Sequence, residues 1–128
     1  MKKIFVNGTF DVMHFGHVSL LKHAKSLGDY LLVAIDSDIR VKSLKGESRP
    51  INSLFERMTL VRNLKWVDDV VAFGTDEELE SIISTYQPDI TLRGSDHRST
   101  SIPHGVVQFF PRIETYSSTS EIQKIKKL

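Results

Sequence analysis

A strand, a helix and a second strand can be recognised at the start of the chain, and this order restricts the fold more than any other feature. The apolar runs from Ile4 to Val6 and from Tyr30 to Ile35 predict the two strands. Between them apolar residues recur at helical spacing, and Gly28 is placed to end the helix. Strands joined through a helix lie parallel, and continuous apolarity is typical of strands covered on both faces. The sequence therefore predicts an α/β fold with a parallel sheet.

The same alternation continues to the C-terminus. Apolar runs at 67–73, 89–92 and 106–110 predict three more strands. Capping boxes, in which a hydroxyl residue is followed three residues later by Glu, predict helix starts at Ser53, Thr75 and Ser118. The first of these helices should run to about residue 64, and the charged segment 39–52 predicts a loop. We expect a single α/β, Rossmann-like, three-layer domain over residues 1–128, with a parallel sheet of about five strands.

Composition excludes several classes of protein. The 17 Lys and Arg against 16 Asp and Glu give a net charge of +1, which lends no support to nucleic-acid binding. No apolar run approaches the roughly 20 residues that a membrane-spanning helix needs. The chain has no cysteine, so disulfides and thiolate zinc sites are excluded. Since Met1-Lys2-Lys3-Ile4 leads directly into a strand without a signal-peptide pattern, we expect a cytoplasmic protein.

The turn after the first strand has the features of a phosphate site. Asn7-Gly8 breaks the apolar run, because Gly8 can take backbone angles that are closed to other residues. His14 and His17 fall just before the following helix or in its first turn. A helix start offers unpaired N–H groups and a partial positive charge, and two imidazoles three residues apart can add donors on the same side. Gly8 and Gly16 leave room for a phosphate chain to approach the backbone closely.

These residues also form a known signature. Gly8-Thr9-Phe10-Asp11 followed by His14-Phe15-Gly16-His17 resembles the signature of the HxGH nucleotidyltransferase superfamily, and within it the small cytidylyltransferases, such as those that act on glycerol 3-phosphate. The resemblance implies that His14 and His17 are catalytic. It also implies nucleotide contacts by Gly8, Thr9, Phe10 and Gly16. The alternative is a surface histidine pair on an ordinary strand-turn-helix. A zinc site is disfavoured, since the two histidines are three residues apart with no Glu between them.

A middle segment extends the resemblance. Residues 41–52 look like the corresponding loop of heptose-phosphate nucleotidyltransferases, in which lysines face the phosphates. This implies a catalytic role for Lys42 and Lys45 without favouring either. The family also places a nucleotide-binding arginine at the position of Arg57, although an ion pair in solvent is an equal alternative there.

The C-terminal part carries the remaining candidates. In the resemblance the loop after the fourth strand contacts the base and the sugar, which implies nucleotide binding by Arg93, Gly94 and Asp96. Arg93 departs from the Lys or Met that often precedes this glycine. The segment from Arg112 to Thr119 is similar to the signature that closes the active site of cytidylyltransferases. It implies nucleotide binding by Arg112, Ser117, Ser118 and Thr119.

The resemblance implies a reaction in which a substrate phosphate attacks the α-phosphorus of CTP or ATP and pyrophosphate leaves. Mg²⁺ is expected to arrive with the nucleotide, and Asp11 is either its nearest acidic ligand or a turn residue. The tail favours CMP transfer to a small phosphorylated alcohol such as glycerol 3-phosphate, and we favour this function. The middle loop favours the alternative, an adenylyltransferase that acts on a heptose 1-phosphate. A nucleotide-binding regulatory module without turnover is the non-enzyme alternative. From the habit of the family we also expect a homodimer.

Overall fold

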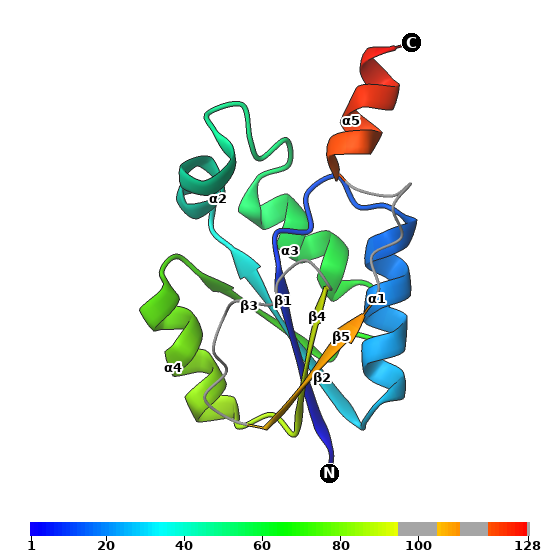
Figure 1. The fold of residues 1–128 in the computed structure, drawn as a ribbon, viewed down its shortest axis with the longest axis vertical. Coiled ribbons are helices and arrows are strands. Elements are labelled where there is room, and N and C mark those ends of the chain that lie inside the picture. Colours follow the sequence, from blue (N-terminus) through cyan, green and yellow to red (C-terminus); the bar gives the residue numbers. More distant parts are fainter. Residues whose placement is uncertain (95–104, 111–117, 128) are drawn as a thin grey trace.

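The computed structural model describes residues 1–94, 105–110 and 118–127 of the chain. Its strands form one sheet with helices packed on both faces, and all strands run in the same direction (Figure 1). In chain order the elements are β1 (Lys3–Gly8), α1 (Phe15–Ser26), β2 (Tyr30–Asp36), α2 (Asp38–Lys45), α3 (Leu54–Arg62), β3 (Asp69–Phe73), α4 (Asp76–Tyr86), β4 (Ile90–Gly94), β5 (Val106–Phe110) and α5 (Ser118–Lys126). The five-stranded parallel sheet confirms the predicted fold class.

β1 lies at the centre of the sheet, whose strand order is β3-β2-β1-β4-β5. β2 pairs with one side of β1, where Gly8 lies beside Ile35, and β4 pairs with the other side, where Phe5 lies beside Thr91. The first half of the chain therefore extends the sheet in one direction from β1, and the second half extends it in the other. In open α/β sheets ligands bind outside the carboxyl ends of the strands at such a switch point. Here that point lies between β1 and β4.

Each face of the sheet has its own apolar core. α1 and α3 cover one face, where Leu21 and Val61 pack in one cluster with Val6. α4 covers the other face, where Leu79 and Ile83 pack with Phe5. Burial on both faces explains why β1 and β2 are continuously apolar rather than alternating. Within the described ranges, no helix is long and apolar enough to cross a membrane.

Residues 39–52, predicted as a loop, begin with a helix instead. Ser37 caps α2 by accepting a hydrogen bond from the Arg40 N–H over 3.2 Å. Asp38, in the first turn, interacts favourably with the helix dipole. Among its residues the helix buries only Val41, so the sequence carries no apolar stripe here. The prediction of a loop was wrong because a short, charged helix that buries one side chain does not show apolar residues at helical spacing.

Three helix ends test the predicted caps. Ser53 and Glu56 form the expected reciprocal cap, with hydrogen bonds of 2.9 and 3.2 Å. α1 ends at Ser26, two residues before the predicted terminator Gly28. Gly28 is not left-handed, and it is needed because a Cβ there would lie 2.8 Å from the Lys2 carbonyl oxygen. α5 begins at Ser118, which is the predicted helix start, and the third capping box stays a prediction.

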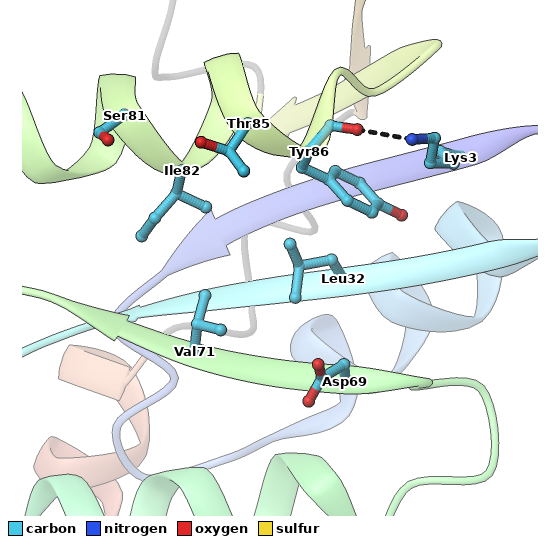
Figure 2. Close-up of a pocket in the computed structure, with 8 residues that line it drawn as sticks. All are labelled: Lys3, Leu32, Asp69, Val71, Ser81, Ile82, Thr85 and Tyr86. Atoms are coloured by element: carbon cyan, nitrogen blue, oxygen red, sulfur yellow. Dashed lines mark hydrogen bonds between the residues drawn. The ribbon is translucent and has the colours of Figure 1, made fainter.

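A groove between α4 and the sheet lies toward the amino ends of the strands (Figure 2). Its lining includes Lys3 and Asp69, which are the first residues of β1 and β3. The Lys3 ammonium donates to the Tyr86 carbonyl over 2.8 Å, and the Tyr86 hydroxyl lies 3.1 Å from the Ile4 carbonyl oxygen. These bonds hold the end of α4 on the sheet. The groove is therefore at the opposite end of the strands from their carboxyl ends, where the switch point between β1 and β4 lies.

Candidate active site

The two histidines of the signature cap α1 with their own side chains. His14 is the N-cap residue, and its Nδ1 accepts the Gly16 N–H over 3.0 Å. His17 reaches back, and its Nδ1 accepts the His14 N–H over 3.2 Å. The two rings stack with their centroids 3.9 Å apart. This is the reciprocal geometry of a capping box, built here from imidazoles. The prediction that both histidines lie at the helix start is confirmed.

The caps determine where the protons of the two rings lie. A ring nitrogen that accepts a hydrogen bond carries no proton, so in each ring the proton is on Nε2. Burial lowers the pKa of His17 to about 3, and the neighbouring His14 and Lys45 act in the same direction while Asp11 opposes them. His17 is therefore a neutral N–H donor at neutral pH. The pair presents two Nε2–H groups beside the N-terminus of a helix, which is an arrangement suited to phosphate oxygens.

The loop between β1 and α1 is held in an unusual conformation. Phe10 and Val12 have left-handed backbone angles, with φ of 53° and 49°, while Gly8 does not. Gly8 is needed for space instead, because a Cβ there would lie 3.0 Å from the Phe10 ring. Phe10 is 3% exposed, and its ring centroid lies 5.3 Å from that of His17. The Phe10 side chain therefore packs in the core against the His17 ring, and nucleotide contact by Phe10 stays a prediction.

Asp11 anchors this loop to residues 49–52. Its carboxylate accepts the N–H groups of Ile51 and Asn52, both over 2.8 Å, and Arg49 Nε lies 3.3 Å away. The Asn52 amide oxygen accepts the Val12 N–H over 3.3 Å in return. The anchoring role agrees with the turn-residue alternative, and metal binding by Asp11 stays a prediction. Sequence reasoning did not single out Arg49 or Asn52, although both lie in the segment that carries the second resemblance.

Arg57 is a buried connection between the loops at the carboxyl edge of the sheet. It is 0% exposed. Nη1 donates to the carbonyls of Thr9 and Asp36 over 3.0 and 2.7 Å, and Nε donates to the Asn52 carbonyl over 3.0 Å. Nη2 pairs with the Asp38 carboxylate over 2.6 Å. The Arg57 side chain is buried, so its pair with Asp38 is not the ion pair in solvent of the alternative, and nucleotide binding by Arg57 stays a prediction.

The two candidate lysines lie on α2, and ion pairs fix that helix in place. Arg40 bridges Asp36 at the end of β2 and Asp76 at the start of α4, over 3.1 and 2.8 Å. Lys42 and Lys45 are exposed on the same helix. Of the two lysines, Lys45 is the one whose charge acts on His17. A catalytic role for either lysine stays a prediction.

The remaining candidates divide between two regions. Arg93 and Gly94 end β4, and the Arg93 side chain is buried. Ser118 and Thr119 begin α5, which lies at the same end of the molecule as the start of α1 (Figure 1). Asp96, Arg112 and Ser117 lie outside the described residues. Nucleotide contacts by these residues, and by Gly8, Thr9 and Gly16, stay predictions.

A metal ion has no ready-made protein site in the described part of the chain. No group of three or more His, Asp or Glu side chains gathers there in a way that could hold one. The Asp11 carboxylate already accepts two backbone N–H groups. These residues therefore do not form a metal centre of their own.

Known proteins match almost the whole length of the chain. A model of the cytidylyltransferase-like family matches residues 5–124. The bifunctional protein HldE of Campylobacter jejuni subsp. doylei is 43% identical over 129 residues, which cover 98% of this chain and 28% of that protein. HldE of Marinomonas sp. is 40% identical over 131 residues, or 96% of this chain and 27% of that protein. The chain thus spans only 28% of the length of the first of these relatives.

Solved structures show the same fold. The lipopolysaccharide core biosynthesis protein of Thermoplasma volcanium GSS1 superposes with a TM-score of 0.75 and 26% identity, over 91% of this chain and 99% of that one. Pantoate-beta-alanine ligase of Francisella tularensis superposes with a TM-score of 0.62 at 16% identity, over 99% of this chain and 70% of that one, and shows the fold alone.

Proposed function

The chain belongs to the cytidylyltransferase-like family, a family of nucleotidyltransferases, and we propose that it transfers a nucleoside monophosphate from a nucleoside triphosphate to a phosphorylated sugar. In this reaction an oxygen of the acceptor phosphate forms a bond to the α-phosphorus. The bond from the α-phosphorus to the bridging oxygen breaks, and pyrophosphate leaves. Such a displacement requires no covalent enzyme group, only positioning and stabilisation of charge.

The observation that carries this proposal is the reciprocal histidine cap. Both Nδ1 atoms are occupied by backbone N–H groups, so both rings offer Nε2–H donors at the helix N-terminus. Negative charge grows on the α-phosphate oxygens and the bridging oxygen as pyrophosphate departs. Donors that are already aligned stabilise this charge without reorganising during the reaction. Lys45, whose charge acts on His17, would add a cation on the same side.

A sugar phosphate is favoured as the acceptor. A lipopolysaccharide core contains sugars, and the structural relative with a TM-score of 0.75 is named for the biosynthesis of that core. Residues 41–52 also resemble the loop of heptose-phosphate nucleotidyltransferases, and the heptose 1-phosphate members use ATP. We therefore place ATP and a heptose 1-phosphate first among the substrate pairs.

CMP transfer from CTP to glycerol 3-phosphate is the second candidate. The segment from Arg112 to Thr119 supports it through its resemblance to cytidylyltransferases, and the matching family model is cytidylyltransferase-like. Mg²⁺ would enter with either nucleotide, held mainly by its phosphates. We assign no step to the metal, because the described residues form no site for it.

Pyrophosphate release with ATP and with CTP, across a panel of phosphorylated sugars and polyols, tests the proposal. We expect turnover with ATP and a sugar 1-phosphate. Turnover with CTP and glycerol 3-phosphate would select the second candidate. Nucleotide binding without pyrophosphate release from any pair would favour a regulatory module and overturn the proposal. Sedimentation at micromolar concentration tests the expected homodimer, which a 14.6 kDa species would contradict.

A further inference from the structure

Three polar side chains at the switch point have buried atoms without a hydrogen-bond partner. They are the Nε and Nη2 of Arg93, the Oγ1 of Thr91 and the Oδ1 of Asn7. Arg93 is 7% exposed and Thr91 is 0% exposed. Asn7 is on β1 and the other two are on β4, so the cluster lies between the two strands where ligands of such sheets bind.

The three side chains share one face of the sheet. Thr91 lies beside Phe5 in the β1–β4 register, and Asn7 and Arg93 follow two residues further along each strand. Side chains alternate along a strand, so all three point to the face of Phe5, which α4 covers. The histidine pair caps α1, which packs on the other face. The cluster and the histidines therefore flank the end of β1 from two sides.

Arg57 shows what a structural arginine looks like in this molecule. It is fully buried, and Nε, Nη1 and Nη2 all donate to oxygen atoms of the protein. Arg93 is nearly as buried but lacks this compensation at two of its nitrogens. Arginine is almost never buried without a partner, because desolvating an unpaired charge is costly. Burial also lowers the pKa of Arg93. The described part of the chain therefore supplies no partner for these two nitrogens, and a bound anion would pair with them.

The unpaired atoms indicate which anion fits. Nε and Nη2 lie on the same edge of the guanidinium group and donate in parallel, which matches two oxygens of one phosphate. The amide oxygen of Asn7 needs a donor, and the hydroxyl of Thr91 can donate or accept. Hydroxyl groups on the ligand meet both needs. The combination describes a small molecule that carries a phosphate and several hydroxyls.

We propose that Asn7, Thr91 and Arg93 form the binding site for the acceptor substrate. The acceptor phosphate binds Nε and Nη2 of Arg93, and sugar hydroxyls bind Asn7 and Thr91. The inference rests on the proposed function and gives Arg93 a different role from the nucleotide contact implied by the sequence. Two oxygens of the acceptor phosphate bind Nε and Nη2 of Arg93, and the third attacks the α-phosphorus. The bond between the α-phosphorus and the bridging oxygen breaks, and pyrophosphate leaves with its electron pair. The acceptor then approaches the end of β1 from the face that α4 covers, and the nucleotide approaches it from the face that α1 covers.

Arg93→Met tests the proposal, with Arg62→Met as the matched control because Arg62 is an exposed arginine of α3. We expect Arg93→Met to raise the KM of the acceptor by about 10- to 100-fold, as for loss of a charged hydrogen-bonding partner, and to leave the nucleotide KM within about twofold. Arg93→Lys, which keeps the charge but not the two parallel donors, should recover part of this loss. A rise in the nucleotide KM instead would overturn the proposal.

The melting temperature without ligand separates a binding role from a structural one. Replacing an unpaired buried charge by an apolar side chain of similar length is neutral or stabilising, so Arg93→Met should melt at the parent temperature or above it. A marked fall in melting temperature would show that Arg93 supports the fold and would overturn the proposal. Arg93→Lys provides a second folded variant for the KM comparison if Arg93→Met does not fold.

Direct binding keeps this inference distinct from the proposed function. Calorimetric titration with inorganic phosphate and with glucose 1-phosphate, in the absence of nucleotide, requires no turnover. Binding to the parent and to Arg62→Met, with loss in Arg93→Met, would support the acceptor site even if the parent released no pyrophosphate. Equal binding by all three proteins would overturn it, even if the parent were an active nucleotidyltransferase.

Discussion

Replacing His17 by Asn separates the two roles that the structure gives to its imidazole ring. Nδ1 accepts the His14 N–H over 3.2 Å, and Nε2 carries the proton that can reach a phosphate oxygen. The Oδ1 of Asn can take the place of Nδ1, but Asn has no donor at the position of Nε2. We therefore expect His17→Asn to keep the helix cap and lose the donor, whereas His17→Ala loses both.

The two losses have different sizes and different readouts. Removing one preorganised donor lowers kcat by about 10²- to 10³-fold, and we expect this of both variants. The KM of the nucleotide should change little, because the donor acts mainly on the transition state. Removing the cap costs about 1 kcal/mol of stability, which corresponds to about 4 °C in Tm for a domain of this size. Only His17→Ala should show that shift.

Pyrophosphate release and thermal unfolding, measured on the same preparations, give both quantities. If His17→Asn turns over at the parent rate, Nε2 is not the donor and the assignment of the site is wrong. If His17→Asn melts as low as His17→Ala, the Nδ1 cap is not what His17 contributes to the fold. The two variants thus test the two halves of the argument independently.

Other substitutions test the remaining assignments. Lys45→Ala should raise the KM of the nucleotide more than Lys42→Ala does, because the charge of Lys45 acts on His17; equal effects in initial-rate measurements would contradict this. Arg57→Met leaves four oxygen acceptors without their donor and should cost about 3–5 kcal/mol in urea unfolding, so a loss below about 1 kcal/mol would refute the buried connection. His17 gains its proton near pH 3 when folded and near pH 6.5 when unfolded, so the unfolded chain binds more protons between these values. Its contribution is complete above pH 6.5 and is lost as the pH falls toward 3, by at most about 1.4 kcal/mol per pH unit. Urea unfolding of the parent and of His17→Asn across this range should show a shallower acid loss in the variant, and identical slopes would argue against a neutral buried His17.

Local sequence patterns predicted the parts of the fold that depend on neighbours along the chain. The apolar runs gave a parallel five-stranded sheet, and Ser53 with Glu56 formed the cap that their spacing predicts. The HxGH pattern placed both histidines at a helix start and indicated the nucleotidyltransferase family, which the family match confirms. A helix cap or a strand is determined over a few residues, so the sequence is enough to find it.

The roles of the charged and polar side chains at the site were decided by contacts between distant segments. Arg57 looks like a surface residue of α3 until loops from three parts of the chain surround it, and Asp11 is joined to Asn52 across 41 positions. α2 exists without an apolar stripe because Arg40 and Asp38 bind it to neighbouring elements. The same holds for the atoms of Arg93, which become buried without partners only when β4 joins the sheet beside β1. The sequence by itself determined the order of elements and the position of the histidine pair at a helix start, because both follow from local spacing. Only the tertiary structure decided that Arg57 is fully paired and that Arg93 has buried atoms without a partner, because burial and pairing depend on residues far apart in the chain.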